Sequence, residues 1–355
     1  MNQIFKDSSS NVFSQSLNIK GVHLKNRIFL APLAGVSDIP FRRICQEMGA
    51  GLTFVEMLSS TALSYKNKKT LQMAERHPDE EILGVQLTGN REDHFKDGLE
   101  VLNQQNFEVI DLNMGCPVKK VVQSGCGSAL LLDLEKVEKF FNILKDTSPG
   151  KIVSTKFRLG YTRQQLIMED VSLLAQNTGL DMITIHGRTR NERYDTPVDL
   201  HSISLAFKNL KELPHKPLTI ANGDIFSFDD AMDAYKTTEC DAVMVSRGAL
   251  GNPWIFQEIL QGEPIRPHID EWIDVVSRHL SYQNDYYKDE TLASILFRKH
   301  LVWYTTGFPG VKKFREKIGT LETQESILDY LKEISLTIPK ETQRSYHVDQ
   351  KSAVK

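Results

Sequence analysis

The sequence predicts an α/β protein, a (β/α)8 TIM barrel followed by a small all-helical C-terminal domain. Eight runs rich in Ile, Val, Leu, Phe and Met recur over the first two thirds of the 355-residue chain, and segments with helical patterning separate them. Nearly continuous apolar runs are typical of parallel strands that are buried on both faces. Their regular alternation with helices favours a closed barrel.

The predicted strands lie, in chain order, at 27–32, 52–56, 82–87, 109–113, 152–158, 182–186, 218–222 and 242–246. Helices are expected between them, for example at 134–144 and 228–235, and Ser227-Phe-Asp-Asp230 resembles a capping box at the start of the latter. A doubly wound sheet is the competing fold. It would need G-x-G-x-x-G after the first strand, where the sequence reads Ala31-Pro-Leu-Ala-Gly35.

After residue 256 the strand-like runs stop and apolar residues recur at helical spacing. We therefore expect four parts. They are a flexible N-terminal extension at 1–17, a catalytic barrel at 18–256, a helical domain at 257–339 and a polar, disordered tail at 340–355.

Composition narrows the class of protein. A hydrophobic content of 40% with 25% charged residues is typical of a globular protein. No run is long and apolar enough to span a membrane, and residues 1–16 lack the features of a signal peptide, so we expect a cytoplasmic protein with no membrane partner. The four cysteines form no C-x-x-C pair, so no metal site is expected. The net charge of −3 gives no support for nucleic-acid binding, and a monomer is the default expectation.

Polar or otherwise unusual residues follow every predicted strand. One such residue would be ordinary turn chemistry, but eight in succession predict the lining of a single pocket at the carboxyl ends of the strands, where barrel enzymes place reactive groups. The residues are Pro32, Glu56, Gln86, Asn113, Lys156, Arg158, His186, Asn222, Gly223, Asp224, Ser246, Arg247 and Gly248.

The last two strand ends predict a phosphate site. Their glycines leave backbone N–H groups accessible, and Arg247 can form paired hydrogen bonds with a phosphate. Barrels bind phosphate at this location, although two ordinary glycine turns would have the same sequence.

Flavin mononucleotide fits the rest of the lining. Lys156 could place positive charge near the N1–O2 edge, Gln86 could bond near the N4–N5 side, and the turn at 31–34 could pack under the ring. Lys156 alone would also suit the Schiff-base nucleophile of an aldolase-type barrel.

Cys116 is the candidate catalytic residue. It follows the fourth strand in Asn113-Met-Gly-Cys-Pro117, on a loop at the expected pocket mouth. An ordinary thiol is mostly protonated at neutral pH, and no histidine base adjoins it in sequence, so a proton-donating role is favoured over a nucleophilic one. Cys45 and Cys240 are expected to be packing residues, and Cys126 stays open.

Several motifs resemble those of the tRNA-dihydrouridine synthases over about residues 18–334. They are Ala31-Pro-Leu-Ala-Gly-Val-Ser-Asp-Ile-Pro-Phe-Arg42, Asn113-Met-Gly-Cys-Pro117 with the glycine cluster after it, Lys156-Phe-Arg-Leu-Gly160, Ile185-His-Gly-Arg-Thr-Arg190, Ala221-Asn-Gly-Asp-Ile225, Arg247-Gly-Ala-Leu-Gly-Asn-Pro-Trp254 and Arg298-Lys-His300. Three departures are Leu33 for methionine, Ser246 for glycine, and Asp195-Thr-Pro-Val-Asp199 for Gly-x-Ala-Asp.

The resemblance implies an FMN-binding barrel, NADPH (or NADH) as reductant and tRNA as partner. Reduced flavin would deliver hydride to C6 of a flipped-out uridine, and Cys116 would protonate C5. The implied flavin contacts are Pro32, Leu33, Ala34, Gln86, Lys156, His186, Asn222, Gly223, Asp224, Ser246 and Arg247. Asn113, Arg158 and Arg188 are the implied contacts to uracil.

The helical domain carries a basic segment at 296–317. It contains Arg298 and Lys299 and interleaves basic residues with Trp303, Tyr304, Phe308 and Phe314. We expect it to contact RNA, with Arg298 and Lys299 among the substrate-binding residues. The alternative is an FMN-dependent dehydrogenase of the dihydropyrimidine or dihydroorotate type that acts on a free small molecule. A non-catalytic RNA-binding flavoprotein is a third reading.

Overall fold

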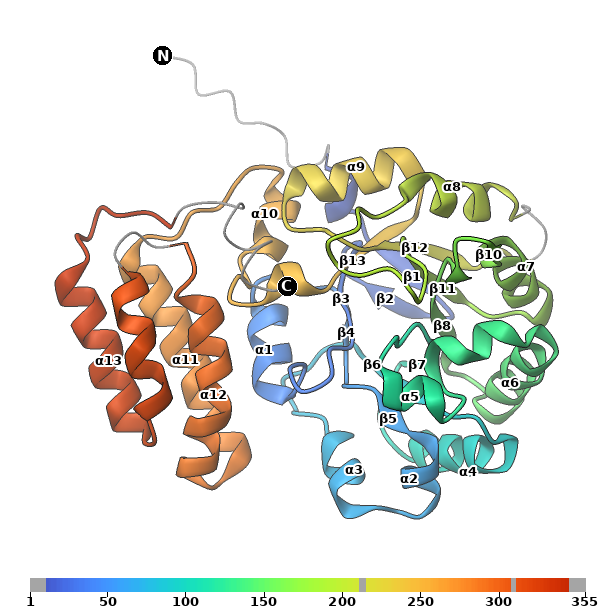
Figure 1. Cartoon of the computed structure of the whole chain (residues 1–355), viewed down its shortest axis with the longest axis horizontal. Helices are drawn as coiled ribbons and strands as arrows, with labels where there is room; N and C mark the ends of the chain where they lie inside the picture. The colour runs from blue at the N-terminus through green and yellow to red at the C-terminus, as the bar shows by residue number, and fades with distance from the viewer. Residues whose placement is uncertain (1–10, 211–214, 308–310, 345–355) are drawn as a thin grey trace.

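Eight parallel strands form a closed barrel in the computed structural model, which describes residues 11–210, 215–307 and 311–344 (Figure 1). Their order is β3-β13-β12-β11-β8-β7-β6-β4. The N–H of Leu30, at the end of β3, donates to the carbonyl of Leu52, before β4, at 2.8 Å, and this contact closes the ring. The predicted (β/α)8 barrel is confirmed.

The eight barrel strands lie where the apolar runs predict them. Their bounds are β3 Ile28–Leu30, β4 Thr53–Phe54, β6 Leu83–Thr88, β7 Val109–Met114, β8 Ile152–Arg158, β11 Met182–His186, β12 Leu218–Asn222 and β13 Ala242–Val245. Short additions not predicted are β5 Leu58–Ser59, which pairs with β6, and the hairpins β1 Leu17–Ile19 with β2 Val22–Leu24 and β9 Gly160–Thr162 with β10 Gln165–Leu166.

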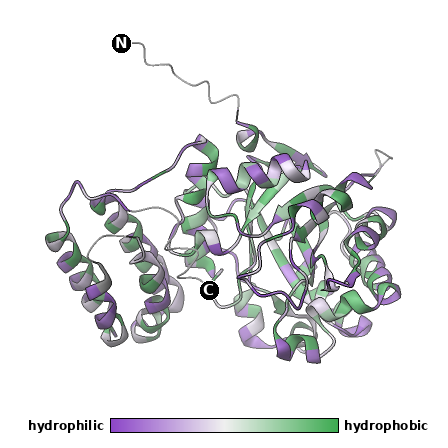
Figure 2. Cartoon of the chain, turned by 45° about the horizontal axis from the view of Figure 1, so that its top comes forward, coloured by the Kyte–Doolittle hydropathy of each residue, from purple (hydrophilic) through white to green (hydrophobic). Residues whose placement is uncertain are grey.

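Helices surround the barrel, and their hydrophobic sides face the strands (Figure 2). They are α1 Ile39–Glu47, α2 Ser60–Ser64, α3 Lys68–Met73, α4 Glu92–Asn103, α5 Lys119–Gln123, α6 Leu134–Thr147, α7 Met168–Thr178, α8 Leu200–Lys208, α9 Phe228–Thr238 and α10 Ile255–Gln261. The capping box before α9 forms only in part. Ser227 accepts from the N–H of Asp230, but the Asp230 carboxylate accepts from Phe226, one residue before the cap.

The β1–β2 hairpin closes one end of the barrel. A second core inside the ring contains Phe29, Phe54 and Met182, and the apolar side chains of Leu17, Ile19 and Val22 pack against it. Val109, Ile152 and Met182 in this core are the first residues of β7, β8 and β11, so the hairpin covers the amino ends of the strands and the open end of the barrel is the carboxyl end. Apolar burial of this kind stabilises a fold by roughly 25 cal/mol per Å².

The helical domain contains α11 Ile269–Tyr287, α12 Glu290–Tyr304, the 3-10 segment η5 Val311–Thr320 and α13 Gln324–Thr337. It packs beside α1 of the barrel (Figure 1). At this junction the guanidinium of Arg43 lies 3.7 Å from the ring centre of Tyr282, and Glu47 accepts from Tyr282 and Arg278 at 2.6 Å. None of the helices in the described part of the chain combines the length and apolar character needed to cross a membrane.

Some described residues of the predicted N-terminal extension and C-terminal tail contact the rest of the chain. In the N-terminal extension, Phe13 is fully buried and the Asn11 side chain donates to the carbonyls of Ile259 and Leu260. In the tail, the guanidinium of Arg344 is buried and donates to the carbonyl of Thr306 at 2.8 Å. The described residues of both segments therefore have partners elsewhere in the chain, and the flexible extension and the disordered tail stay predictions. Residues 1–10 and 345–355 lie outside the described residues.

Candidate active site

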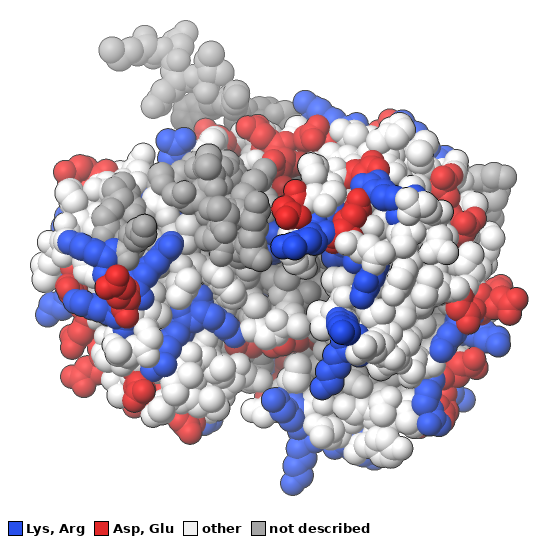
Figure 3. Space-filling model, viewed as in Figure 1, with Lys and Arg blue, Asp and Glu red and all other residues white. Residues whose placement is uncertain are grey.

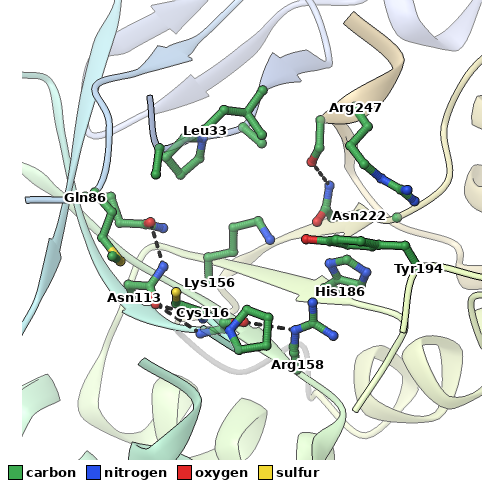
Figure 4. A pocket seen from close by; sticks show the side chains of 18 of the residues that line it. Leu33, Gln86, Asn113, Cys116, Lys156, Arg158, His186, Tyr194, Asn222 and Arg247 are labelled. Carbon is green, nitrogen blue, oxygen red and sulfur yellow. Dashed lines mark hydrogen bonds between the residues drawn. The ribbon is translucent and has the colours of Figure 1, made fainter. Parts of the chain in front are cut away.

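A cavity of about 310 Å³ opens at the carboxyl ends of the barrel strands. Figure 3 shows Lys and Arg side chains on both sides of the hollow between the barrel and the helical domain. Figure 4 shows the walls of the cavity. The structure brings together most of the predicted site residues: Pro32, Leu33, Ala34, Gln86, Asn113, Cys116, Lys156, Arg158, His186, Asn222, Gly223, Asp224, Ser246 and Arg247.

One end of the cavity is built by the turns after β12 and β13. The Nδ2 of Asn222 donates to the carbonyl of Met244 at 2.7 Å and to Oγ of Ser246 at 2.9 Å, which ties the two turns together. The Oδ1 of Asn222 is buried and has no hydrogen-bond partner among the described residues. Buried polar atoms are rarely left unpaired, so this oxygen points to a ligand that donates a hydrogen bond.

Glycines are needed in these turns. Gly223 has φ +125, and a Cβ there would lie 2.6 Å from Cγ1 of Val198. A Cβ at Gly248 would lie 2.1 Å from the carbonyl oxygen of Ile225. Larger residues would therefore distort both turns, so the glycine pattern of the sequence has a steric cause here.

The polar wall of the cavity is cationic. Burial and, less strongly, the nearby charge of Arg158 lower the pKa of Lys156 to about 8, while Asp111 opposes the shift. Burial and the same cations hold the pKa of His186 well below its usual range, so the imidazole is neutral. A cluster of buried positive charge is costly unless an anion or strong acceptor offsets it. The arrangement suits an anionic ligand.

The loop after β7 holds the thiol of Cys116 at the cavity. Oδ1 of Asn113 accepts from the backbone N–H of Cys116 at 3.0 Å and from that of Gly115 at 3.3 Å. Both the N–H and the hydroxyl of Ser128 donate to the carbonyl of Cys116, and Nε of Arg158 donates to the carbonyl of Gly115. Burial raises the pKa of the Cys116 thiol above its ordinary value. The thiol is therefore protonated at neutral pH and can act as an acid.

Arg188 does not reach the cavity. Its side chain is fully buried, and it donates to the carbonyls of Thr196 and Tyr194 and forms an ion pair with Asp224. It thus holds the loop after β11 against the turn after β12. The polar atoms of Arg188 are thus engaged within the protein, and its contact with uracil stays a prediction.

Arg298 and Lys299 make hydrogen bonds within the protein, and their contact with RNA stays a prediction. Nε of Arg298 donates to the carbonyl of Leu321 within the helical domain at 2.7 Å. Lys299 donates to the carbonyl of Gly35, in the turn at 31–37 whose first residues line the cavity, and the N–H of Gly35 donates to Glu56. Lys299 therefore links the helical domain to the cavity wall.

The aromatic part of the basic segment is largely core. Tyr304 and Phe314 are buried, whereas Trp303 is partly exposed. Phe308 lies outside the described residues. Tyr304 and Phe314 thus stabilise the helical domain, whereas the charged residues Lys313, Glu316 and Lys317 of the segment are exposed.

Several lining or supporting residues were missed from the sequence. Met57, Val118, Tyr194 and Phe226 are among those that line the cavity, and Asp111 lies behind it on β7. Tyr194 sits in an irregular loop, so no periodicity marks it. Asp111 gives one signal, an acidic residue inside an otherwise apolar strand. Among the described residues, no three His, Cys, Asp or Glu side chains gather as a metal site requires.

Comparisons agree with the geometry. A family model described as dihydrouridine synthase matches residues 29–341. The tRNA-dihydrouridine synthase B of Pasteurella multocida is 35% identical over 311 residues, covering 86% of this chain and 91% of that protein. A probable tRNA-dihydrouridine synthase of Rickettsia bellii is 33% identical over 329 residues, covering 91% of this chain and 98% of its own.

Solved structures share the barrel. The 6-hydroxypseudooxynicotine amine oxidase of Pseudomonas geniculata aligns with a TM-score of 0.59 at 13% identity, covering 94% of this chain and 68% of that one. Histamine dehydrogenase from Rhizobium aligns with a TM-score of 0.56 at 12% identity, covering 94% and 66%. At such identities the likeness shows the fold alone. By the family match and the curated relatives, the chain belongs to the dihydrouridine synthase family.

Proposed function

We propose that this chain is a tRNA-dihydrouridine synthase that binds FMN at the barrel mouth and uses NADPH as reductant. The observation that carries the proposal is the placement of the Cys116 thiol, the Lys156 ammonium and the unpartnered Oδ1 of Asn222 on one cavity, in a chain of this family. An acid can protonate the pyrimidine, a cation can stabilise negative charge on a flavin ring, and an unpaired acceptor can bind a hydroxyl of the cofactor.

The cavity fits a flavin mononucleotide. Arg247 and the glycine turns at Gly223 and Gly248 would hold the phosphate, as barrels do after the last two strands. Oδ1 of Asn222 would accept from a hydroxyl of the bound group, and Lys156 would stabilise negative charge on the ring. The turn at 31–34 lies opposite the Cys116 loop (Figure 4).

The chemistry divides between the flavin and the thiol. A bound reduced flavin supplies the hydride for C6 of uracil. Cys116 donates the proton to C5, because its raised pKa keeps the thiol protonated. Asn113 and Arg158 line the same cavity and are the proposed contacts to the base. A uridine must leave its stack to enter, at a cost of a few kcal/mol.

The helical domain is the proposed tRNA surface, together with the barrel rim. Lys313 and Lys317 on η5 are exposed, as are Lys119 and Lys120 on α5 beside the cavity. Phosphate contacts by such residues would make tRNA binding fall steeply with salt. They would offset the cost of extruding the base.

The test begins with the purified protein. Heat-released chromophore, separated by chromatography against FMN and FAD standards, should be FMN. The protein should then reduce uridines in unmodified tRNA, with NADPH preferred over NADH, and leave free uracil and orotate unchanged. Turnover of a free pyrimidine without turnover of tRNA would instead support the small-molecule dehydrogenase.

A further inference from the structure

Asp111 lies behind the cavity and accepts hydrogen bonds at both carboxylate oxygens. It stands between Gln86 on β6 and Ser154 on β8, directly opposite each of them in the strand register. Oδ1 accepts from Oγ of Ser154 at 2.6 Å, and Oδ2 accepts from Nε2 of Gln86 at 2.7 Å. Only 3% of Asp111 is exposed. This carboxylate has no contact with the cavity itself among the described residues.

The hydrogen bonds continue from Asp111 to the Cys116 loop. Oε1 of Gln86 accepts from Nδ2 of Asn113 at 2.7 Å, and Oδ1 of Asn113 accepts from the N–H of Cys116 at 3.0 Å. Figure 4 shows the last part of this chain. Each amide side chain donates at one end and accepts at the other. The direction in which the first amide points therefore fixes the direction of the second.

An ionised carboxylate only accepts hydrogen bonds, so Asp111 can bond Gln86 in one orientation alone. If Gln86 turned over, its NH2 group would face the NH2 group of Asn113. Asn113 would then turn as well and present a donor to the N–H of Cys116, which would lose its acceptor. Unpaired donors in a partly buried loop are unfavourable, so the loop would shift.

We propose that Asp111 is a positioning residue that sets the orientation of the Gln86 and Asn113 amides and thereby the place of the Cys116 thiol. The expected effect of Asp111 on turnover rests on the proposed role of Cys116 as proton donor. The expected effect of Asp111 on the position of the thiol does not. Burial raises the pKa of Asp111 to about 6, which leaves the carboxylate ionised at neutral pH.

The test uses the purified protein with its flavin and compares Asp111→Val with Asp111→Asn. Valine suits a strand but removes the acceptor. Asparagine keeps an oxygen for Gln86 and can donate to Ser154. Two quantities are measured: the rate at which iodoacetamide alkylates Cys116, assigned against Cys126 by peptide mass spectrometry, and kcat and KM on unmodified tRNA.

In Asp111→Val we expect a several-fold change in the alkylation rate and a fall in kcat of about 100-fold, the size of a misplaced catalytic group, with little change in KM. Asp111→Asn should resemble the wild type in both. Asp181→Val is the matched control, since it removes a buried carboxylate that accepts from the N–H of Val153 at the opposite end of the barrel. It should lower stability and leave Cys116 unaffected.

An unchanged alkylation rate in a folded, yellow Asp111→Val protein would overturn the inference. So would an altered rate in Asp111→Asn, which also decides the matter if the valine variant does not fold. A changed alkylation rate with an unchanged kcat would support the positioning role of Asp111 and refute the acid role of Cys116. A lowered kcat with an unchanged alkylation rate would refute the positioning role and leave the acid role standing.

Discussion

The guanidinium of Arg247 lies 4.1 Å from the ring centre of Tyr194, and its Nη2 donates to Oδ1 of Asp224 at 2.7 Å. The two contacts hold one arginine between the loop after β11 and the turns after β12 and β13. Because Arg188 binds the same Asp224 and the carbonyl of Tyr194, three loops are joined at the proposed phosphate end. The cation there is fixed in place before any anion arrives, which favours binding.

Replacing Arg247 should separate phosphate recognition from ring recognition. We expect Arg247→Met to weaken FMN binding about 10- to 100-fold, the loss of one charge-assisted contact, and to change riboflavin binding little. Fluorescence titration of the flavin-free protein measures both. Arg190→Met, which removes a cation stacked 5.3 Å from Tyr161, is the control. Equal losses for FMN and riboflavin would contradict the assignment.

Removing the proposed acid should spare the cofactor. Cys116→Ala is expected to retain its flavin and to lose about 10²- to 10⁴-fold in kcat on tRNA, the usual contribution of a positioned acid. Dihydrouridine formation and the flavin absorbance spectrum measure the two properties. Cys126→Ala, a change at a neighbouring free thiol, should keep its activity. An active Cys116→Ala enzyme would exclude the thiol from the reaction.

Lys156 should be a source of instability in the flavin-free protein. Its pKa falls from 10.5 to about 8, so the charged form is disfavoured by at most about 3 kcal/mol at pH 7. Because the folded pKa lies below the unfolded one, this penalty is present below pH 8 and fades as pH rises to 10.5.

We therefore expect Lys156→Met to raise the free energy of unfolding at pH 7 by up to about 3 kcal/mol and to bind flavin more weakly. Urea unfolding at pH 7 and pH 10 measures the first effect, which should shrink at the higher pH. The exposed Lys139→Met should show neither change. A destabilised Lys156→Met would show that the ammonium is better compensated than its burial implies.

Two buried histidines should make the fold sensitive to acid. The rings of His279 and His300 lie 4.6 Å apart between the barrel and the helical domain. Burial lowers the pKa of His279 to about 3 and that of His300 well below its usual range. Their folded pKa values lie below the unfolded value of 6.5, so stability is lost as pH falls from 6.5.

Each histidine should lower the free energy of unfolding by about 2 kcal/mol at pH 5. Thermal unfolding at pH 5 and pH 7.5 measures the combined effect of the two histidines. His300→Phe should remove about half of the difference, since both ring nitrogens of His300 lack partners among the described residues. The variant His23→Phe, at an exposed position in the hairpin, serves for comparison. If the wild type and His300→Phe lost the same stability between pH 7.5 and pH 5, the acid sensitivity would come from other groups.

The sequence predicts the barrel closely for a physical reason. Strands buried on both faces leave unbroken apolar runs, and β11 and β12 have the predicted bounds. The cavity lining was predictable because strand ends carry it. The directions of long side chains were not predictable, since Arg188 and Lys299 each have a partner in a loop that is distant in sequence, Asp224 and Gly35 respectively. The burial of Tyr304 and Phe314 was not predictable either, because an aromatic residue beside lysines in the sequence can face the core or the solvent.

The hairpin of β1 and β2 also limits how ligands can enter the barrel. Leu17, Ile19 and Val22 close the amino end of the barrel, so ligands that enter the barrel share the opening at its carboxyl end. Under the proposed function, NADPH and the uridine would reach the flavin through this opening one after the other. Reduction of the flavin and its reoxidation should then be separate steps, so double-reciprocal plots of the initial rate against one substrate, at several concentrations of the other, should be parallel.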